Sequence, residues 1–599
     1  MPLSGLMAGH SGAGPSVPDP DLFPFRNLLK PLLPLERVRE LYRRALQPIN
    51  RSLLENLLKE MQVTYNVTSE DLARVPAEGP VLVTANHPLG ILDGALLGAL
   101  LLQVRTDVKI LTNFLLSGVP ELQEYCIFVD PYAEEEYAGL NRRGMRQALE
   151  WLSSGGMLIT FPAGEVSYLR FPQFEVSDPN WHPATARLIR TSGASALPVF
   201  LHGQNRAAMR MLSRIHPSLR TAWLLTEFLQ QKNRTIEVRI GTPVPAKNIA
   251  KIGAGREATD YMRWRTYLLA QRGASQWQFP NPLPAILPKK KQDPIAESLP
   301  AQSLLQDIGN LGPCVAENRE FQVFIAEAKQ IPHLMQELGR LREVTFRAAG
   351  EGTGRRSDLD HFDLYYRHVL LWSKANRELV GSYRMALTSE VLPTRGIGGL
   401  YTSTVFRYDH RVFEQLGPAL ELGRSFVRLE YQRQFAPLLM LWKGIGHFLS
   451  LHLDVAVVFG AVSVSNCYNR TSRELIVRFF RAQQKKDEFA KLIRPRRPFR
   501  GTWIRPGDCL ATCNRLRDLN ELADPISDVE SDGKSIPILL KHYAKLGGRL
   551  LSFNVDRKFS DALDGLVLVD LRQTDPLVLE RYMGKEGVAN FRKQHNLTS

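Results

Sequence analysis

The sequence predicts two domains, an α/β domain with helices around a mostly parallel sheet and then a mixed α+β domain. Its 599 residues are too many for one typical domain of about 100–200 residues. From Val81 to about Ala250, short apolar runs that resemble strands alternate with helix-like segments, as in parallel α/β sheets. Beyond a proline-rich stretch, strand-like runs come first and surround only a few helices, which indicates a mixed domain.

The N-terminal segment allows two interpretations. Residues 1–20 are rich in Gly, Pro and Ser, and we expect them to be disordered. Residues 22–61 mix Leu and Phe with Arg and Lys at helix-like spacing, which Pro31 and Pro34 interrupt. This segment can be a helical layer on the following domain, a basic amphipathic surface that lies on anionic lipid, or both.

The first domain is predicted over residues 21–271. Its strands are short runs rich in Val, Ile, Leu and Phe, and its helices are longer segments with apolar residues at helical spacing. The predicted strands are 81–85, 108–113, 126–130, 156–162, 196–202 and 235–241. The predicted helices are 93–104, 141–154, 181–193 and a closing helix at 261–271.

The second domain is predicted over residues 316–575, between a linker at 272–315 and a polar tail at 576–599. The linker holds many Pro residues and a run of three Lys at 289–291, and it lacks periodicity. The predicted strands are 321–328, 367–374, 378–387, 419–427 and 455–464, with more strand-like sequence in 542–571. The predicted helices are 332–350 and 437–452.

The composition limits the possible partners and compartments. A net charge of +15 favours an acidic partner, namely nucleic acid, an anionic membrane or an acidic carrier protein. No zinc finger or aromatic RNA-binding motif supports nucleic acid. Five Cys suggest reduced cytosolic thiols, and Cys509 with Cys513 lacks a second Cys/His pair, so we expect no metal site. The sequence has no uncharged run of 18 apolar residues and no secretory signal, so we expect a soluble or peripheral cytoplasmic protein.

A His and an Asp stand where the first strand of the α/β domain gives way to a helix, in the stretch VLVTANHPLGILDG that begins at Val81. An imidazole accepts a proton near pH 7, and a carboxylate on its other nitrogen fixes the tautomer. His87 and Asp93 would then deprotonate a hydroxyl or amine at the carboxyl edge of the sheet, where α/β proteins bind ligands. The alternative is a turn residue at His87 and a helix N-cap at Asp93.

Two further segments follow this pair, the block FPAGEVS at 161–167 and a Pro in the apolar run 196–200. In this order they resemble the glycerolipid (lysophospholipid) acyltransferase family, over about residues 60–270. The matching residues are Asn86, His87, Asp93, Phe161, Pro162, Gly164, Ser167 and Pro198. The resemblance implies that His87 is the general base on an acceptor hydroxyl and that Asp93 orients it. It also places substrate-binding roles on Asn86, Gly164, Glu165 and Ser167.

The departures from that family concern the acceptor. The gap between His87 and Asp93 is one residue longer than in the family pattern, so the turn must bulge. Glu165 and Val166 replace the family's Thr and Arg, Ala163 replaces its Glu, and the run 126–130 lacks a second Arg. Because Arg is the natural bidentate partner of phosphate, these changes argue against a glycerol-phosphate acceptor. Glu165 would suit a cationic amine instead, unless a nearby Arg compensates; the candidates are Arg142, Arg143 and Arg170.

The second domain carries four charged motifs: Arg342 in a helix-like segment, the acidic group 358–363, Arg384 in a strand, and Glu421 with Arg424 in another. Each has an ordinary interpretation. Arg342 would be a charge on a helix surface, the acidic group a polar turn, and Glu421 with Arg424 a salt bridge along a strand.

In sequence order these motifs resemble the ornithine N-acyltransferase family, which is akin to acyl-homoserine-lactone synthases and has an acetyltransferase-like fold. The resemblance covers about residues 320–570. Further matches are Leu441–Gly444, Phe459, Gly460, Tyr543, Leu546, Gly547, Asp556, Phe559 and Asp564. It implies transfer of a (3-hydroxy)acyl chain from the phosphopantetheine thioester of acyl carrier protein to a free amine. The amine attacks the thioester directly, so neither a Ser or Cys nucleophile nor a bound cofactor is expected.

The resemblance also suggests roles for the charged residues. Glu421 would accept the proton of the amine, through water or directly. Asp358 and Asp363 would hold the cationic amino-acid substrate. Three arginines would face the carboxylate of that substrate or the phosphopantetheine, namely Arg342, Arg384 and Arg424.

Together the two halves resemble a bifunctional ornithine lipid synthase. The second domain would N-acylate ornithine and the first would O-acylate the 3-hydroxyl of the product, at the cytoplasmic face of the inner membrane. One alternative has the same architecture with glycine or another amino acid as the acceptor. Another makes the first domain a lysophosphatidate acyltransferase, and a third is a non-catalytic basic protein that binds membranes.

Overall fold

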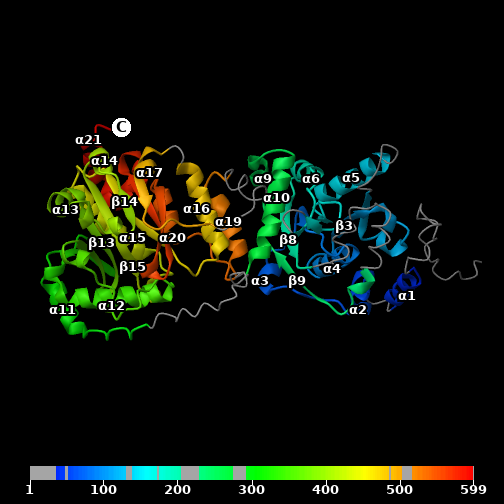
Figure 1. Ribbon diagram of the computed structural model, residues 1–599, viewed down its shortest axis with the longest axis horizontal. Coiled ribbons are helices and arrows are strands. Elements are labelled where there is room, and N and C mark those ends of the chain that lie inside the picture. The colour runs from blue at the N-terminus through cyan, green and yellow to red at the C-terminus, as the bar shows by residue number, and fades with distance from the viewer. Residues whose placement is uncertain are drawn as a thin grey trace, which may run out of the picture. The chain divides into compact units, whose positions relative to one another are not determined.

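The chain forms two compact units (Figure 1). The computed structural model describes residues 35–47, 52–129, 138–170, 175–203, 228–273, 292–484, 487–501 and 516–597. The described residues up to 273 form the first unit and those from 292 onward form the second. The predicted disordered N-terminus, the Lys run at 289–291 and the Cys509–Cys513 pair lie outside the described residues.

A seven-stranded sheet organises the first unit, in the order β1-β9-β8-β2-β5-β3-β4. Neighbouring strands of this sheet pair in parallel except β8 with β9, so the predicted α/β domain with a mostly parallel sheet is confirmed. The central strands are buried apolar runs, as expected when helices cover a parallel sheet. The strands are β1 (Thr64–Asn66), β2 (Val81–Ala85), β3 (Val108–Asn113), β4 (Cys126–Val129), β5 (Met157–Thr160), β8 (Ser195–Leu201) and β9 (Thr235–Ile240). A separate hairpin pairs β6 (Tyr168–Arg170) with β7 (Glu175–Ser177).

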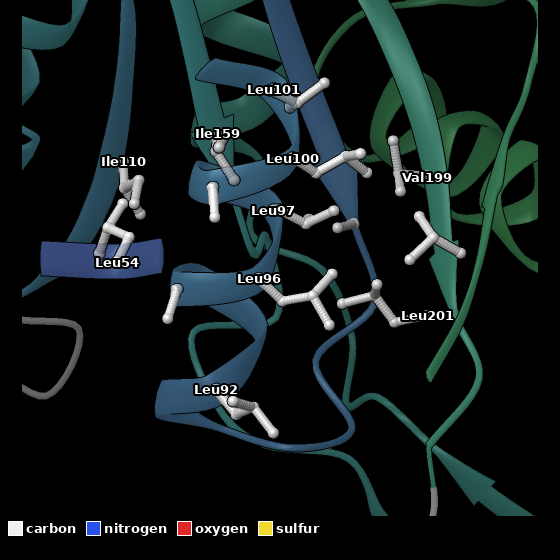
Figure 2. Close-up of a cluster of buried hydrophobic side chains, with 14 of the residues drawn as sticks. Leu54, Leu92, Leu96, Leu97, Leu100, Leu101, Ile110, Ile159, Val199 and Leu201 are labelled. Carbon is white, nitrogen blue, oxygen red and sulfur yellow. The ribbon is translucent and has the colours of Figure 1, made fainter. Parts of the chain in front are cut away.

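Helix α4 (Ile91–Leu102) fills the core on one face of this sheet. It is apolar on nearly all sides, which is typical of a fully buried helix. Figure 2 shows its leucines beside Val199 and Leu201 of β8, with Leu54 beside Ile110. A Cβ at Gly98 would lie 2.6 Å from Leu54 Cδ1, so the absence of a side chain lets α2 (Leu53–Glu60) approach.

The remaining helices of the first unit cover the sheet and its ends. Helix α10 is tied to the central strand because Thr266 Oγ1 donates to the Thr84 carbonyl over 3.0 Å. The predicted closing helix therefore exists, but it begins five residues earlier, at Arg256. These helices are α1 (Leu35–Ala45), α2 (Leu53–Glu60), α3 (Ser69–Leu72), α5 (Ala138–Ser153), α6 (Ala184–Ser192), α9 (Ala246–Ile252) and α10 (Arg256–Leu268).

An eight-stranded sheet organises the second unit, in the order β10-β11-β12-β13-β15-β16-β19-β18. Only the pairing of β15 with β16 is parallel, so the expected mixed α+β domain is also confirmed. The strands are β10 (Ala316–Glu317), β11 (Phe321–Glu327), β12 (Arg367–Ser373), β13 (Glu378–Leu387), β15 (Ala419–Val427), β16 (Val457–Val464), β18 (Arg549–Asp556) and β19 (Ala562–Asp570). A small sheet pairs β14 (Phe406–Tyr408) with β17 (Ile493–Pro495).

Helices pack on both faces of the second sheet. Leucines of α12 pack with Phe324, whereas Gly444 of α15 lies against the adjacent Val323, whose side chain points to the opposite face. The helices are α11 (Ala301–Gly309), α12 (Pro332–Ala348), α13 (Thr388–Arg395), α14 (Arg411–Leu416), α15 (Ala436–Leu451), α16 (Arg470–Gln484), α17 (Glu488–Leu492), α19 (Leu519–Val529), α20 (Ile538–Lys545) and α21 (Pro576–Gln594). Among the described residues, none of the helices has both the length and the apolar character that a membrane span requires.

Two helices stand where the sequence analysis placed a linker and a tail. Helix α11 lies within the predicted linker and packs on α12, with Leu304 in the core. Helix α21 lies within the predicted polar tail and buries four apolar side chains, Leu579, Met583, Val588 and Phe591. The non-helical Gly584 inside α21 shifts the phase of these residues, which hides their periodicity in the sequence.

Candidate active sites

His87 and Asp93 form a pair at the carboxyl edge of the first sheet. His87 follows β2 and Asp93 lies in the first turn of α4, and the Nδ1 to Oδ2 distance is 2.9 Å. The longer gap between them is absorbed by a turn at Gly90, whose φ of +69° favours glycine. Gly90 is also the N-cap of α4, so the alternative interpretation of Asp93 as an N-cap is wrong.

The pair is oriented as a general base requires, with the carboxylate buried and the imidazole accessible. The Asp93 side chain is 0% exposed and that of His87 is 18% exposed, so only the imidazole reaches the surface. Burial raises the pKa of Asp93, and the hydrogen bond from His87 opposes that rise. With Nδ1–H donated to the carboxylate, Nε2 keeps its lone pair for the proton of an acceptor. The Phe161 ring stacks on the imidazole, with 4.3 Å between centroids, and restrains its plane.

Asn86 extends the strand pairing rather than facing a substrate. Its side-chain Nδ2 donates to the Leu201 carbonyl over 3.0 Å, and the Leu201 N–H donates back to Oδ1 over 2.7 Å. The amide thus imitates one more residue of backbone between β2 and β8. This contact fixes the start of the His87 loop, and we attribute a structural role to Asn86 on that basis.

The FPAGEVS block folds onto the His87 loop through its last residue. The Ser167 N–H donates to the His87 carbonyl over 2.8 Å, and Ser167 Oγ donates to Asp178 Oδ1 over 2.5 Å. The block turns at Gly164, where φ is +66°, and Glu165 in the same turn is half-buried. Arg142 and Arg143 are exposed on α5, and the Arg170 side chain lies outside the described residues.

Asp178 is a part of this site that the sequence analysis missed. Its carboxylate is 0% exposed and accepts from the His87 N–H over 3.2 Å and from Trp181 Nε1 over 2.9 Å, besides Ser167 Oγ. A single Asp after a short strand belongs to no spacing pattern, so the sequence held no signal for it.

In the second unit, the charged motifs of four separate segments meet in one buried network. Arg342 Nη1 of α12 lies 2.8 Å from Asp363 Oδ1, and Arg384 Nη1 of β13 lies 3.0 Å from the same oxygen. Arg384 also pairs with Asp360 over 2.6 Å. Both arginine side chains are 0% exposed, so the interpretation of Arg342 as a helix-surface charge is wrong.

This network is paired only in part. Arg342 and Arg384 each leave Nε and Nη2 without a hydrogen-bond partner among the described residues, and both carboxylate oxygens of Asp358 also lack one. Although burial opposes ionisation, the two arginines hold the pKa of Asp363 well below its usual range. These residues do make ion pairs, but a buried polar atom without a hydrogen bond is costly, so the free donor and acceptor atoms are suited to a polar or charged ligand. Asp363 already has two arginine partners and is therefore not free to hold a substrate amine.

Glu421 lies on β15 and makes no salt bridge to Arg424, contrary to the ordinary interpretation of that motif. Its carboxylate accepts from the Thr402 N–H over 2.7 Å, from the Tyr401 N–H over 3.1 Å, and from the Tyr366 hydroxyl. Burial raises the pKa of Glu421. With three donors on two oxygens and 1% exposure, Glu421 holds the 401–402 turn more readily than it exchanges protons with a substrate.

Arg424 marks the point where β15 and β16 part. Their register pairs only Ala419–Leu422 with Val457–Gly460, although both strands continue beyond it. Arg424 has a left-handed φ of +49°, and its guanidinium lies over the rings of Phe559 and Tyr401 at 4.1 and 4.8 Å. It also pairs with Asp358 over 3.3 Å, which links this point to the buried network.

The comparisons with known proteins agree with this division. The chain matches an acyltransferase family over residues 26–274 and an acetyltransferase (GNAT) domain family over residues 341–443. A glycine N(alpha)-acyltransferase from Bacteroides thetaiotaomicron is 36% identical over 188 residues, which are 30% of this chain and 55% of that protein. The chain therefore spans about half the length of this relative.

Two relatives from Phocaeicola vulgatus match different parts of the chain, and one is named for N-acylation and the other for O-acylation. A glycine N(alpha)-acyltransferase is 28% identical over 46% of this chain and 86% of its own length. A lyso-glycine lipid O-acyltransferase is 25% identical over 34% of this chain and 73% of its own length. The chain thus joins an N-terminal acyltransferase domain to a C-terminal GNAT-type acetyltransferase domain, both of which are domains of acyl-transferring enzymes.

Proposed function

We propose that this chain makes a phosphorus-free aminolipid in two acyl transfers. The second unit N-acylates an amino acid with a 3-hydroxyacyl chain, and the first unit then O-acylates the 3-hydroxyl of that product. The observation that carries the proposal is the presence of two separate sites in one chain, a His–Asp pair and a buried Arg/Asp network. The relatives named for N-acylation and for O-acylation of an aminolipid support the same two steps.

In the O-acylation step, His87 accepts the proton of the acceptor hydroxyl as that oxygen attacks the acyl carbonyl. Asp93 holds the imidazole in the tautomer that leaves Nε2 free. The acceptor in this proposal carries no phosphate, which agrees with the Glu165 and Val166 that replace the family's Thr and Arg. A lysophosphatidate acceptor remains the alternative.

In the N-acylation step, the donor is the thioester of acyl carrier protein. The backbone edges of β15 and β16 beyond Leu422 and Gly460 are not paired with each other, and the amides of a phosphopantetheine arm are suited to such edges. The unpaired groups of Arg342 and Arg384 would receive the carboxylate of the amino acid. Asp358 would contribute to holding its amine.

The acceptor amino acid is ornithine or glycine. The sequence resemblance favours ornithine, and the names of the relatives favour glycine. The net charge of +15 supports both an acidic carrier protein and peripheral attachment to the anionic cytoplasmic face of the inner membrane. The mass of the lipid product distinguishes the two amino acids.

The test is a lipid extract from a bacterial host that lacks aminolipids. Expression of the intact chain should give a new ninhydrin-positive, phosphorus-free lipid. His87→Ala should accumulate the mono-acylated form, and Glu421→Gln should make neither form because the 401–402 turn loses its carboxylate acceptor. The exposed Glu586→Gln is the matched control. A rise in phosphatidic acid that depends on His87, without any aminolipid, would refute the proposal and favour the lysophosphatidate alternative.

A further inference from the structure

Three carboxylates gather beyond the point where β15 and β16 part, and we call Glu351, Asp556 and Asp564 the carboxylate cluster. Glu351 follows α12, and its Oε2 accepts from Ser463 Oγ on the separated end of β16 over 2.7 Å. The register pairs Ser463 with Asp564 on β19, and Asp564 with Asn554 on β18. Residues paired across strands share one face, so Asp564 lies beside Ser463 and hence near Glu351.

Asp564 is 7% exposed, yet its carboxylate accepts no hydrogen bond and makes no ion pair among the described residues, where Arg424 is the nearby charge that favours its ionised form. Asp556 is also 7% exposed and, among the residues that the structure describes, accepts only from the Lys558 N–H, over 2.8 Å. A buried and unpartnered carboxylate beside two more acids is suited to a cationic ligand.

The surroundings of Glu351 make it the proton acceptor of the cluster. Burial raises the pKa of Glu351 to about 7, and the hydrogen bond from Ser463 opposes that rise. Burial, together with Asp556 and Glu351, raises the pKa of Asp564 well above its usual range, and Arg424 opposes this. Tyr468 is a further titratable group near Glu351, and its pKa is raised by burial and by nearby acids, while Cys467 lies against the neighbouring Gly350.

We propose that the carboxylate cluster binds the reacting ammonium group of the amino acid and that Glu351 accepts its proton before it attacks the thioester. This inference rests on the proposed N-acylation and names the base of that step. Glu421, which the sequence favours for this role, has three donors already and lies on the paired part of β15. The cluster lies instead where the two strands are open to a donor.

The protons and bonds of this step balance. The ammonium group carries three protons and passes one to Glu351, which frees the nitrogen lone pair. The nitrogen attacks the thioester carbonyl carbon, an N–C bond forms, and the C–S bond breaks. A second proton passes from nitrogen to the leaving sulfur, and the third stays on the amide. Glu351 then releases its proton to solvent.

The test compares N-acylation by the full chain and by Glu351→Gln, with 3-hydroxyacyl carrier protein as donor and ornithine or glycine as acceptor. At pH 7 we expect kcat/KM for the amine to fall by about 100-fold, as for loss of a general base. The rise of kcat/KM with pH near 7 should also disappear. Hydroxylamine as the acceptor is already mostly uncharged at this pH. With it, the Glu351→Gln substitution should therefore lower kcat/KM by less than about 10-fold.

Two more variants separate this role from a structural one. Ser463→Ala removes the donor that stabilises ionised Glu351, so the acid limb of the pH profile should move to higher pH while the maximal rate persists. Asp564→Asn should raise KM for the amine more than it lowers kcat. Glu586→Gln, on the exposed side of α21, should change neither.

The outcomes separate failure of the proposed N-acylation from failure of Glu351 as its base. No N-acylation by the wild-type chain with any amino acid would refute the proposed function itself. A wild-type chain that is active, with a Glu351→Gln variant that keeps its rate and pH profile, would overturn only this inference. Equal loss with amino acid and hydroxylamine would also overturn it, because a folding defect does not depend on the protonation of the nucleophile.

Discussion

The buried carboxylate of Asp178 accepts three hydrogen bonds, and the two from the His87 N–H and Ser167 Oγ hold the His87 loop against the loop that ends at Ser167. A fourth bond runs directly from the Ser167 N–H to the His87 carbonyl. The His87 motif and the FPAGEVS block are far apart in the sequence but contact each other in the fold, next to His87. Asp178 touches the backbone of His87 and not its ring, so it is a positioning residue.

Asp93→Asn is expected to stabilise the first unit and to inactivate it. Asp93 is fully buried, and its Oδ1 has no hydrogen-bond partner among the described residues. An Asn keeps an oxygen for the Leu89 N–H but removes the buried charge of the ionised carboxylate, so the unfolding free energy should rise by about 1 kcal/mol at a pH above the folded pKa of Asp93. O-acylation should fall by at least about 100-fold because the imidazole loses its carboxylate partner.

The sign of the pH dependence follows from the raised pKa of Asp93. The folded chain binds this proton more tightly than the unfolded chain, whose pKa is near 3.8, so the wild type loses stability as pH rises above that value. The gain from Asp93→Asn should therefore vanish below pH 3.8 and be complete above the folded pKa. Hydrogen exchange of α4 peptides at both ends of this pH range measures the stability difference between the variant and the wild type. A variant less stable than the wild type at pH 7 would contradict the argument.

At the scale of residues, the sequence predicted the site residues that belong to recognisable motifs and not those that stand alone. His87, Asp93 and Ser167 stand in ordered motifs, and the structure brings them together. Asp178 and Glu351 were missed because each stands alone in a loop and meets its partners only through the tertiary fold.

At the scale of elements, the long apolar strands were predictable and the short polar ones were not. Strands such as β2 and β13 are buried runs with strong β-forming residues, and their predicted positions agree with the structure. The three-residue β1 exists only because it pairs with β9, and its sequence carries no periodicity. Helix α16 has apolar residues at the 3.6-residue period, so its sequence does contain a signal for a helix.

Gly460 in β16 allows the parallel contact with β15, and Gly460→Ala should break it. A Cβ there would lie 2.1 Å from the Leu422 carbonyl oxygen, a backbone atom that cannot turn aside. Overpacking of this kind costs about 1–3 kcal/mol, so urea should unfold the second unit at a lower concentration. N-acylation should fall with it, while O-acylation of added lyso-lipid persists.

Gly309 supplies the control for this variant. It lies at the end of α11 with no atom within 4 Å of an added Cβ, so Gly309→Ala should be neutral or slightly stabilising. Equal unfolding midpoints for the two variants would show that the parallel contact does not depend on Gly460.

At the scale of the whole molecule, the proposed function gives one basic chain two acyl transfers, and we propose that both draw on a common donor and a common surface. A net charge of +15 is favourable for both an acidic carrier protein and an anionic bilayer. Surface charge changes the rate at which two proteins associate more than the rate of the chemical step. Its effect should therefore appear in the KM for the donor and not in kcat.

Ionic strength tests this account of the donor. Raising salt from about 50 mM to about 300 mM shortens the Debye length from above 10 Å to below 8 Å and weakens attraction between exposed charges. We expect KM for the acylated carrier protein to rise by about 10-fold while kcat changes little. An acylated pantetheine has the same thioester without the acidic protein, so its KM should change by less than about twofold. If salt raises both KM values equally, the effect lies in the thioester site, and the basic surface does not recruit the carrier.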